Sequence, residues 1–411
     1  MEWGYLALFV LLPWSLECSF GAWKMNLPSE PLIAALGIGL FWFILKNPGA
    51  ARAAFSDNFL LKISFAWIGW LGVSTCFSTM PLVSWKYWAV EAGHWWVFCV
   101  GLAMFPKIWP RAFRLFAFSM AGVVVYTLIH HSFYDFRVDQ ALLAPMPFFP
   151  ENTLYAAVLA MVVTNFHFST KNVEPPNLKA AQTLLLWVGL LFSFCRAAWV
   201  SVLLVGGLFL LLHFRKKWWL FAFAGLVLFA GSLLFSGQIL DRMTKEIGKD
   251  VSTLERLNRF ACALRMAHEK PWTGFGPGTF QFQYIPFQKP EEMTRISARA
   301  PILACNPDTY GRGGGAHSEY FQALAEDGWP GLALWLMLTV AVLWTGFSSF
   351  FRAKTTDYQW FALALTLSLL TFFLHGLANN MLHDGRVAAL VWGGAGWLGG
   401  RFRGCKAGKI A

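Results

Sequence analysis

Three polar clusters interrupt a mostly apolar chain, and each contains a residue able to act on a phosphate or a hydroxyl. The motif FCRAAW holds Arg196, the segment LERLNRFACALRMAH holds Arg256 and Arg265, and AHSEYFQ holds His317 and Glu319. A guanidinium stays charged and binds phosphate through several directed hydrogen bonds. A histidine can take a proton from a hydroxyl near neutral pH. Together these residues predict group transfer from a phosphate-linked lipid donor, with His317 activating the acceptor hydroxyl.

Each of these polar residues also fits a purely structural role. An arginine in a short outward turn can anchor a helix at the membrane interface, and a lone histidine at the end of a span is commonly structural. If Arg196, Arg256 and His317 act on one donor, they must border one cavity. Groups that grip a diphosphate and act beside it should then lie within about 10–12 Å of each other, because reacting atoms approach to roughly 3–3.5 Å.

The composition predicts that the elements positioning these residues cross a membrane. Of the 411 residues, 57% are hydrophobic and only 13% are charged, whereas a soluble domain carries about 25% charged residues. The net charge of +11 would suggest a nucleic-acid partner for a soluble protein. Here the basic residues gather in short connections between apolar runs, as the positive-inside rule requires. We therefore predict an all-α polytopic membrane protein that contacts lipid and no nucleic acid.

Apolar runs of about 20 residues, the length of a transmembrane helix, divide the chain into about twelve spans. The runs are 3–18, 30–46, 58–77, 84–105, 112–131, 149–168, 180–195, 197–213, 217–236, 328–350, 359–378 and 386–400. Lys and Arg concentrate in alternate connections and in the C-terminal tail, which predicts that both termini are cytoplasmic. The whole chain, 1–411, then forms one membrane domain whose polar clusters lie on the opposite side.

Residues 237–316, between the ninth and tenth spans, contain no apolar run long enough to cross a membrane. Long loops in compact proteins are usually functional or disordered. The segment 254–268 has the period of an amphipathic helix, which we expect on the membrane surface. Its apolar face consists of Leu257, Phe260, Ala261 and Leu264. Arg256 and Arg265 flank this face, whereas Arg259 points away from it and should be solvated.

The sequence predicts that the reaction needs neither a metal nor another cofactor. The seven cysteines form no C-x-x-C pair, so zinc and redox motifs are unsupported. An outer-loop group formed by His130, His131, Asp135 and Asp139 fits no standard zinc spacing. The motif GFGPG at 274–278 lacks the Lys-Ser/Thr of a phosphate loop and predicts a turn. Arginines can neutralise a diphosphate instead of a metal.

Two cysteines, Cys262 and Cys305, share the 237–316 loop. An oxidising compartment permits a disulfide between them, and two buried thiols are the alternative. The sequence leaves both open.

A polysaccharide transporter is the alternative from another protein class. Transporters place ionisable residues or broken helices near the middle of the membrane. The predicted spans hold few charges: Lys62 and Lys86 lie near span ends, and Glu91 and His94 are one turn apart and can bond each other. The two classes differ in whether the polar residues face a cavity at the outer leaflet or a path through the whole membrane.

Four stretches of the sequence resemble the O-antigen ligase and polymerase family of bacterial membrane glycosyltransferases. They are FFPENTLYAAVLA, FCRAAWVSVLLVG, ERLNRFACALRMAHEKPWTGFGPGTF and AHSEYFQALAEDGWPGLALWL. The resemblance extends over residues 149–400, and the motifs are specific as a set but weak singly. The sequence departs from the family pattern at Cys195, where serine is usual, and at Asn379, where aspartate is usual.

The resemblance implies transfer of a glycan from undecaprenyl diphosphate to a glycan or lipid A-core acceptor, without a nucleotide or a metal. It assigns the catalytic histidine to His317 and the diphosphate-binding arginines to Arg196 and Arg256. Possible supporting residues are Arg265, Glu319, Tyr320, His375 and His383. The protein would be a multi-pass protein of the bacterial inner membrane with a periplasmic active site.

Ligases, polymerases and protein glycosylases of this kind share the same motifs. An O-antigen ligase-like role in the assembly of lipopolysaccharide or surface polysaccharide is the first expectation. An O-antigen or exopolysaccharide polymerase is the second.

Overall fold

The computed structural model describes residues 1–20, 23–56, 58–168, 176–214, 251–297, 314–353 and 355–406. The first half of the chain contains α1 (Glu2–Leu11), η1 (Leu12–Trp14), β1 (Leu16–Phe20), β2 (Trp23–Leu27), α2 (Ser29–Lys46), α3 (Pro48–Ser56), α4 (Phe59–Cys76), α5 (Pro81–His94), η2 (Trp95–Val100), α6 (Gly101–Met104), α7 (Trp109–Ser132), η3 (Val138–Gln140), α8 (Asn152–Phe168), α9 (Pro176–Leu191) and α10 (Arg196–His213). The second half contains α13 (Val251–Glu269), α14 (Phe280–Gln283), η5 (Ile285–Phe287), η6 (Pro290–Glu292), α16 (Glu319–Arg352), α17 (Thr356–His375) and α18 (Gly385–Lys406).

Within the described residues, six helices are long and apolar enough to cross a membrane, namely α2, α4, α7, α10, α16 and α17. Other predicted runs also coincide with helices: α8, α9 and α18 cover three of them, and α5, η2 and α6 follow one another without a break. The ninth predicted run, 217–236, lies outside the described residues. The polytopic helical fold is therefore confirmed, and the count of twelve spans stays a prediction.

The first predicted span, 3–18, is wrong beyond Leu11. Helix α1 ends there and passes into a single 3₁₀ turn that contains Pro13, because proline has no backbone N–H to continue a helix. Strands β1 and β2 follow as an antiparallel hairpin, with Leu16 opposite Leu27 and Cys18 opposite Met25. Apart from this hairpin, the described elements are helical.

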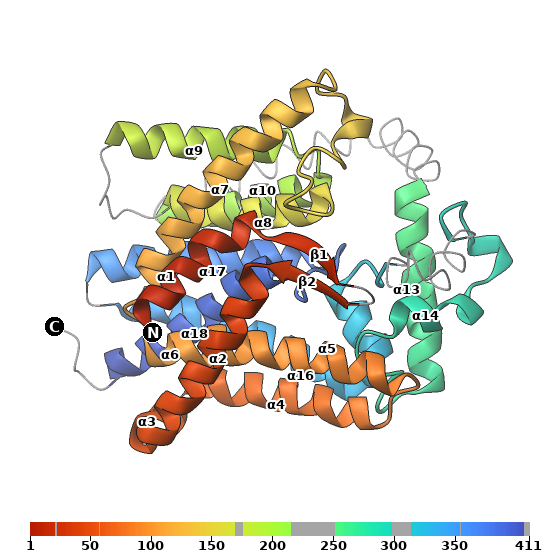
Figure 1. Ribbon diagram of the computed structural model, residues 1–411, viewed down its shortest axis with the longest axis horizontal. Coiled ribbons are helices and arrows are strands. Elements are labelled where there is room, and N and C mark those ends of the chain that lie inside the picture. Colours follow the sequence, from red (N-terminus) through yellow and green to blue (C-terminus); the bar gives the residue numbers. More distant parts are fainter. Residues whose placement is uncertain are drawn as a thin grey trace.

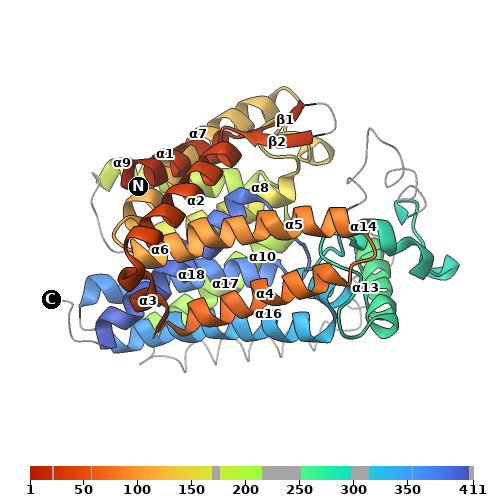
Figure 2. The same cartoon turned by 60° about the horizontal axis from the view of Figure 1, so that its bottom comes forward.

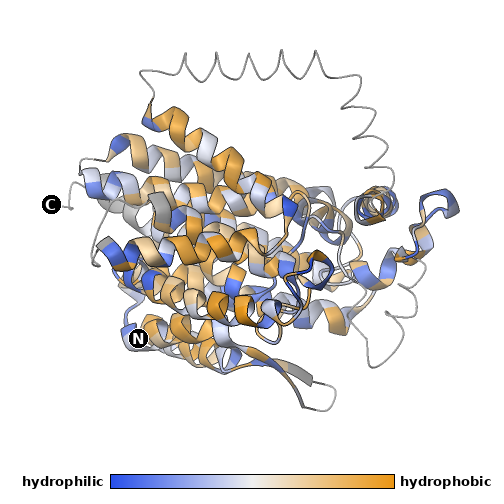
Figure 3. Ribbon diagram, turned by 90° about the horizontal axis from the view of Figure 1, so that it is seen from above, coloured by the Kyte–Doolittle hydropathy of each residue, from blue (hydrophilic) through white to orange (hydrophobic). Residues whose placement is uncertain are grey.

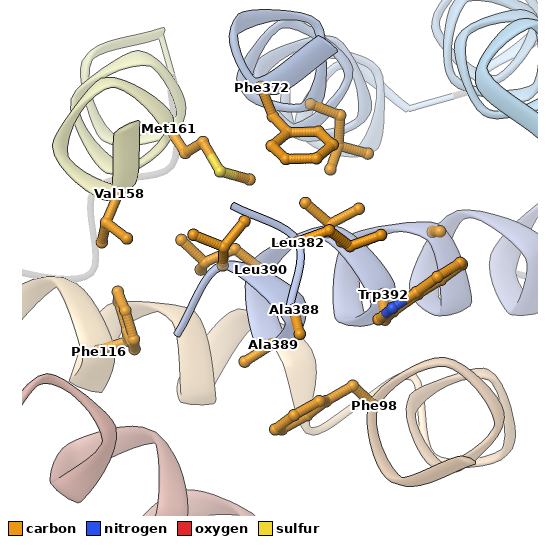
Figure 4. Close-up of a cluster of buried hydrophobic side chains, with 14 of the residues drawn as sticks. Phe98, Phe116, Val158, Met161, Phe372, Leu382, Ala388, Ala389, Leu390 and Trp392 are labelled. Atoms are coloured by element: carbon orange, nitrogen blue, oxygen red, sulfur yellow. The ribbon is translucent and has the colours of Figure 1, made fainter. Parts of the chain in front are cut away.

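The core lies where α7, α8, α17 and α18 meet. Figure 4 shows side chains from these elements pointing toward one another, among them Phe116, Met161, Phe372 and Trp392. Lipid tails are as apolar as these side chains, so close packing rather than exclusion of water stabilises such contacts in a membrane. At Gly400 on α18, a Cβ atom would lie 2.6 Å from the carbonyl oxygen of Ala103 on α6, so glycine is needed for this helix contact.

The bundle helices run side by side, and α13 crosses them at one end of the molecule (Figures 1 and 2). The start of α1 and the end of α18 lie at the opposite end (Figure 1). Hydrophobic residues predominate along the length of the bundle helices, and hydrophilic residues gather toward the two ends (Figure 3). The end of the bundle beneath α13 is where α10 and α16 begin and α17 ends.

Helix α16 contains a kink, and the segment that follows α13 packs against it. Gly328 has φ 71° and ψ −172° within the helix, a conformation open essentially to glycine alone. The N–H of Trp329 donates to the Pro271 carbonyl at 2.9 Å. The kink therefore fixes the segment after α13 to the helix that begins beside His317.

Candidate active site

Helix α13 buries its polar face and exposes its leucines. The predicted helix, 254–268, is confirmed within α13, but Arg259 is only 3% exposed, so its predicted solvation is wrong. The exposed side chains include Leu257 (54%) and Leu264 (49%). Phe260, on the same predicted apolar face, instead stacks on Phe321 of α16 with 4.4 Å between the ring centres. The buried face of α13 combines the polar residues Glu255, Asn258 and Arg259 with the apolar residues Cys262, Ala263 and Met266. An exposed leucine face suits a helix that lies on a membrane.

The buried face of α13 holds an ion pair in which both carboxylate oxygens accept hydrogen bonds. Arg259 Nε lies 2.8 Å from Glu255 Oε1. The second carboxylate oxygen of Glu255 accepts from the hydroxyl of Thr294, at 2.6 Å, and from that of Ser297. Asn258 Nδ2 donates to the same Ser297 hydroxyl at 2.8 Å. A buried charge pair needs such additional bonds to offset its lost hydration.

The backbone leading to His317 is held by three different elements. Arg259 Nη1 donates to the Gly315 carbonyl at 2.6 Å. The Ala316 N–H donates to Gln322 Oε1 at 2.7 Å, and the His317 N–H donates to Asn380 Oδ1 at 3.2 Å. His317 itself has φ 54°, which is uncommon and costly for a residue other than glycine. No role for Asn380 or Gln322 was predicted from the sequence.

The imidazole of His317 is half-buried, and none of the described residues hydrogen-bonds to it. Burial, followed by the positive charges of Arg259 and Arg256, lowers the pKa of His317 to about 3. The ring is therefore neutral at neutral pH and can accept a proton.

The segment 376–384, between α17 and α18, contacts several of the predicted site residues. Arg256 Nε donates to the Ala378 carbonyl at 3.2 Å, and Asn380 accepts from His317. Glu319 Oε1 accepts from the backbone N–H groups of Met381 and Leu382 at 2.5 and 2.8 Å. The structure thus brings Arg256, His317 and Glu319 to one segment.

This segment is itself fixed at both ends. Tyr320 donates its hydroxyl to the Phe373 carbonyl at 3.1 Å, next to the end of α17. At the other end Arg386 bonds both carboxylate oxygens of Asp384, at 2.9 and 2.8 Å. His383 lies beside Asp384 with an exposed side chain. Leu382 belongs to the core cluster drawn in Figure 4.

Arg196 begins α10 and its side chain is exposed. The preceding residue, Cys195, is buried, and its Sγ lies 3.7 Å from Nε2 of His375 at the end of α17. Burial raises the pKa of the Cys195 thiol, whereas the nearby charge of Arg256 opposes that rise. Arg256 therefore lies near the turn that carries Arg196. A common cavity for Arg196 and His317 stays a prediction.

Arg265 has partners of a different kind. Its Nη1 donates to the Phe287 carbonyl at 2.6 Å, and its Nη2 pairs with Glu292. The hydrogen bond from Arg265 lowers the pKa of the Glu292 carboxyl. These contacts fasten the segment of η5 and η6 to α13, so the structure does not bring Arg265 to the segment that holds His317.

The GFGPG motif surrounds a carboxylate of the protein itself. Glu326 on α16 accepts from the backbone N–H groups of Gly278 and Phe280, both at 2.8 Å. Hydroxyl groups on α4 and α5 bind the same stretch of backbone: Ser74 of α4 donates to the carbonyl of Thr273, just before the motif, and Ser84 of α5 donates to the Pro277 carbonyl. The backbone N–H groups that would have to bind a phosphate thus already donate to Glu326. This arrangement agrees with the predicted structural turn.

The outer-loop histidines bind backbone carbonyls of their own loop. Nδ1 of His130 lies 2.9 Å from the Ala144 carbonyl, and Nε2 of His131 lies 2.9 Å from the Arg137 carbonyl. Cys262 is a buried free thiol, and its predicted partner Cys305 lies outside the described residues.

Comparison with protein-family models finds a match over residues 181–336, to a model described as O-antigen ligase. Over these residues the chain is similar to the O-antigen ligase family. The matched region contains Arg196, Arg256 and His317, whereas His375 and His383 lie beyond it. It supports a glycosyltransferase-type role in polysaccharide assembly at a membrane. A sequence search of curated proteins finds no match.

Proposed function

We propose that this protein transfers a glycan from a polyprenyl-diphosphate carrier to an acceptor hydroxyl at the periplasmic face of the bacterial inner membrane. The observation that carries the proposal is the neutral imidazole of His317, which no described residue hydrogen-bonds and which lies near Arg256 within the region that matches the O-antigen ligase model. A general base must be deprotonated and within reach of the proton it removes. The first role to test is that of an O-antigen ligase, with undecaprenyl diphosphate as the carrier.

In the proposed reaction, His317 takes the proton of the acceptor hydroxyl while the acceptor oxygen attacks the anomeric carbon of the glycan. The bond between that carbon and the diphosphate oxygen breaks, and the lipid diphosphate leaves with the bonding electrons. Arg256 and Arg196 stabilise the charge on the leaving group, which guanidinium groups can do through paired hydrogen bonds. The anion also favours the protonated imidazole that forms beside it.

The arrangement of the molecule fits a lipid-linked donor. The candidate site lies at the end of the bundle beneath α13, opposite the start of α1 and the end of α18 (Figure 1). Leu257 and Leu264 on α13 are exposed, so that helix can rest on the outer leaflet. The polyprenyl tail can then remain in lipid while its diphosphate reaches the arginines. No soluble nucleotide donor is required at this face.

The test is an assay of the purified protein with a synthetic polyprenyl-diphosphate glycan, a lipid A-core acceptor and excess EDTA. We expect transfer, and we expect His317→Ala to lower turnover by roughly 10²–10⁴-fold, the usual contribution of a general base. His268→Ala is the control, because His268 is an exposed histidine on α13. Normal turnover by folded His317→Ala protein would refute the proposal.

The same assay separates a ligase from a polymerase. A ligase adds one glycan to the lipid A-core acceptor, whereas a polymerase uses the carrier-linked glycan as both donor and acceptor and produces a ladder of lengths. Turnover that is lost in EDTA and restored by Mg²⁺ would contradict the metal-free reaction.

A further inference from the structure

We infer that Arg259 is a positioning residue for His317, because its guanidinium joins α13 to the backbone that carries the imidazole. The inference rests on the proposed role of His317 as the base. Arg259 is buried, and it donates from Nε to Glu255 and from Nη1 to the Gly315 carbonyl. We assign it no contact with the donor lipid.

Arg259 is held on three sides. Its Nε pairs with Glu255 at 2.8 Å, its Nη1 donates to the Gly315 carbonyl at 2.6 Å, and its Cζ lies 4.8 Å from the ring centre of Tyr284. A Cβ atom at Gly314, which has φ 74°, would lie 3.0 Å from Nη1. The glycine-rich backbone therefore lies directly against a guanidinium that has little freedom to move.

The contact with Gly315 matters because the next two residues are also constrained. Ala316 is bonded to Gln322 on α16, and His317 is bonded to Asn380 in the 376–384 segment. Together the three bonds keep His317 in its unfavourable φ of 54°. Without Arg259, the backbone can relax toward ordinary φ values and carry the imidazole with it. A displacement of about 1 Å can cost roughly 10²-fold in rate.

Arg259 also places a positive charge near the imidazole. The other charged groups on the surrounding elements include Glu255 and Arg256 on α13, Glu319 at the start of α16 and Asp384 in the 376–384 segment. Burial comes first among the causes that lower the pKa of His317, followed by Arg259 and then Arg256. Loss of the Arg259 charge should raise that pKa. The position of the backbone and the charge can therefore be tested separately.

Two variants separate these effects. Arg259→Lys keeps the charge and its pairing with Glu255 but cannot reproduce the planar fork that reaches Glu255 and Gly315 together. The double variant Glu255→Gln, Arg259→Met removes both buried charges, so that neither is left unpaired inside the protein. Arg295→Met is the matched control, because Arg295 is exposed.

Two readouts are needed, turnover at neutral pH and the rate at which diethyl pyrocarbonate modifies His317. The reagent attacks the neutral imidazole, and mass spectrometry of peptides follows His317 alone as the pH is varied. We expect Arg259→Lys to lose roughly 10–100-fold in turnover with little change in the pH of half-maximal modification. The double variant should lose turnover to a similar extent. In that variant, modification of His317 should reach half of its maximum at a higher pH than in the wild type. Arg295→Met should match the wild type in both.

Wild-type turnover in both folded Arg259 variants, or an unshifted modification curve in the double variant, would overturn the inference. If His317→Ala is inactive in the same assay, the proposed function survives that result and only the role of Arg259 fails. If His317→Ala keeps full turnover, the proposed function fails first. If the double variant does not fold, the turnover of Arg259→Lys alone tests the inference. Full turnover in Arg259→Lys is incompatible with a positioning role for Arg259.

Discussion

At the scale of single residues, His317 combines a neutral ring with a strongly basic neighbourhood. Each nearby guanidinium disfavours the imidazolium in the free protein. A bound diphosphate would bring negative charge to the same place, and it would favour protonation of the ring as the reaction proceeds. The basicity of His317 should therefore rise when the donor binds.

The pH dependence of kcat/KM tests this property, because it reports the ionisation of the free protein. The deprotonated imidazole is the active form, so activity falls as the pH drops through the pKa of His317. That pKa is lowered to about 3, so kcat/KM should hold its value between pH 7 and pH 5, where an ordinary histidine with a pKa of about 6.5 would lose activity. An inflection near pH 6.5 that disappears in His317→Ala would contradict the prediction.

Arg196 is a second residue whose chemistry can be tested alone. We expect Arg196→Lys to raise KM for the lipid donor by roughly 10–100-fold, because a hydrogen bond to a charged group contributes about 1.5–3 kcal/mol and a lysine cannot form the paired bonds of a guanidinium. The measurement is initial velocity against donor concentration. Arg295→Lys is the control for an exposed arginine. An unchanged KM in Arg196→Lys would remove this residue from the proposed binding site.

At the scale of elements, α13 shows what a sequence can and cannot predict for a membrane protein. The helix was predictable because its apolar residues recur with helical spacing. The burial of Arg259 was not predictable from that spacing, since the apolar face of a helix can point to lipid instead of protein. The pair Glu255 and Arg259, four residues apart, was the available signal, because such spacing places opposite charges side by side.

The kink in α16 depends on Gly328. A Cβ atom there would lie 2.5 Å from the carbonyl oxygens of Pro271 and Trp272. We therefore expect Gly328→Ala to destabilise the protein by about 1–3 kcal/mol from backbone strain alone, and to lower turnover by displacing the start of α16. Gly207→Ala is the control, because a Cβ on that α10 glycine meets nothing within 4 Å. Thermal unfolding in detergent measures the stability of both variants. Equal melting temperatures would show that the kink can accept a Cβ atom at position 328.

At the scale of the whole molecule, composition predicted the membrane bundle, and the motifs predicted Arg256, His317 and Glu319 as site residues, which the structure brings to the 376–384 segment. The hairpin of β1 and β2 was missed because the first apolar run continues past Pro13 without a charge until Glu17. The contacts of Asn380 and Gln322 were missed for another reason. A polar side chain that fixes backbone has no distinctive spacing in sequence.

The predicted orientation can be tested with single cysteines in a variant whose native cysteines are replaced by serine. Lys289 is exposed near α13, and Lys107 is exposed between α6 and α7 at the other end of the bundle. We expect a membrane-impermeant maleimide to label Lys289→Cys in spheroplasts, and to label Lys107→Cys only after the membrane is opened. The reverse pattern would place the candidate site in the cytoplasm and contradict the proposed donor.

The 376–384 segment sets a limit on how this protein can change in evolution. Loops on protein surfaces usually accept insertions and deletions. Here one short segment provides the Ala378 carbonyl for Arg256, the Asn380 amide for His317 and the backbone N–H groups for Glu319. An inserted or deleted residue would put all three contacts out of register at once. Length variation among relatives should therefore be found in other loops, and this segment should keep a constant length even where its residues differ.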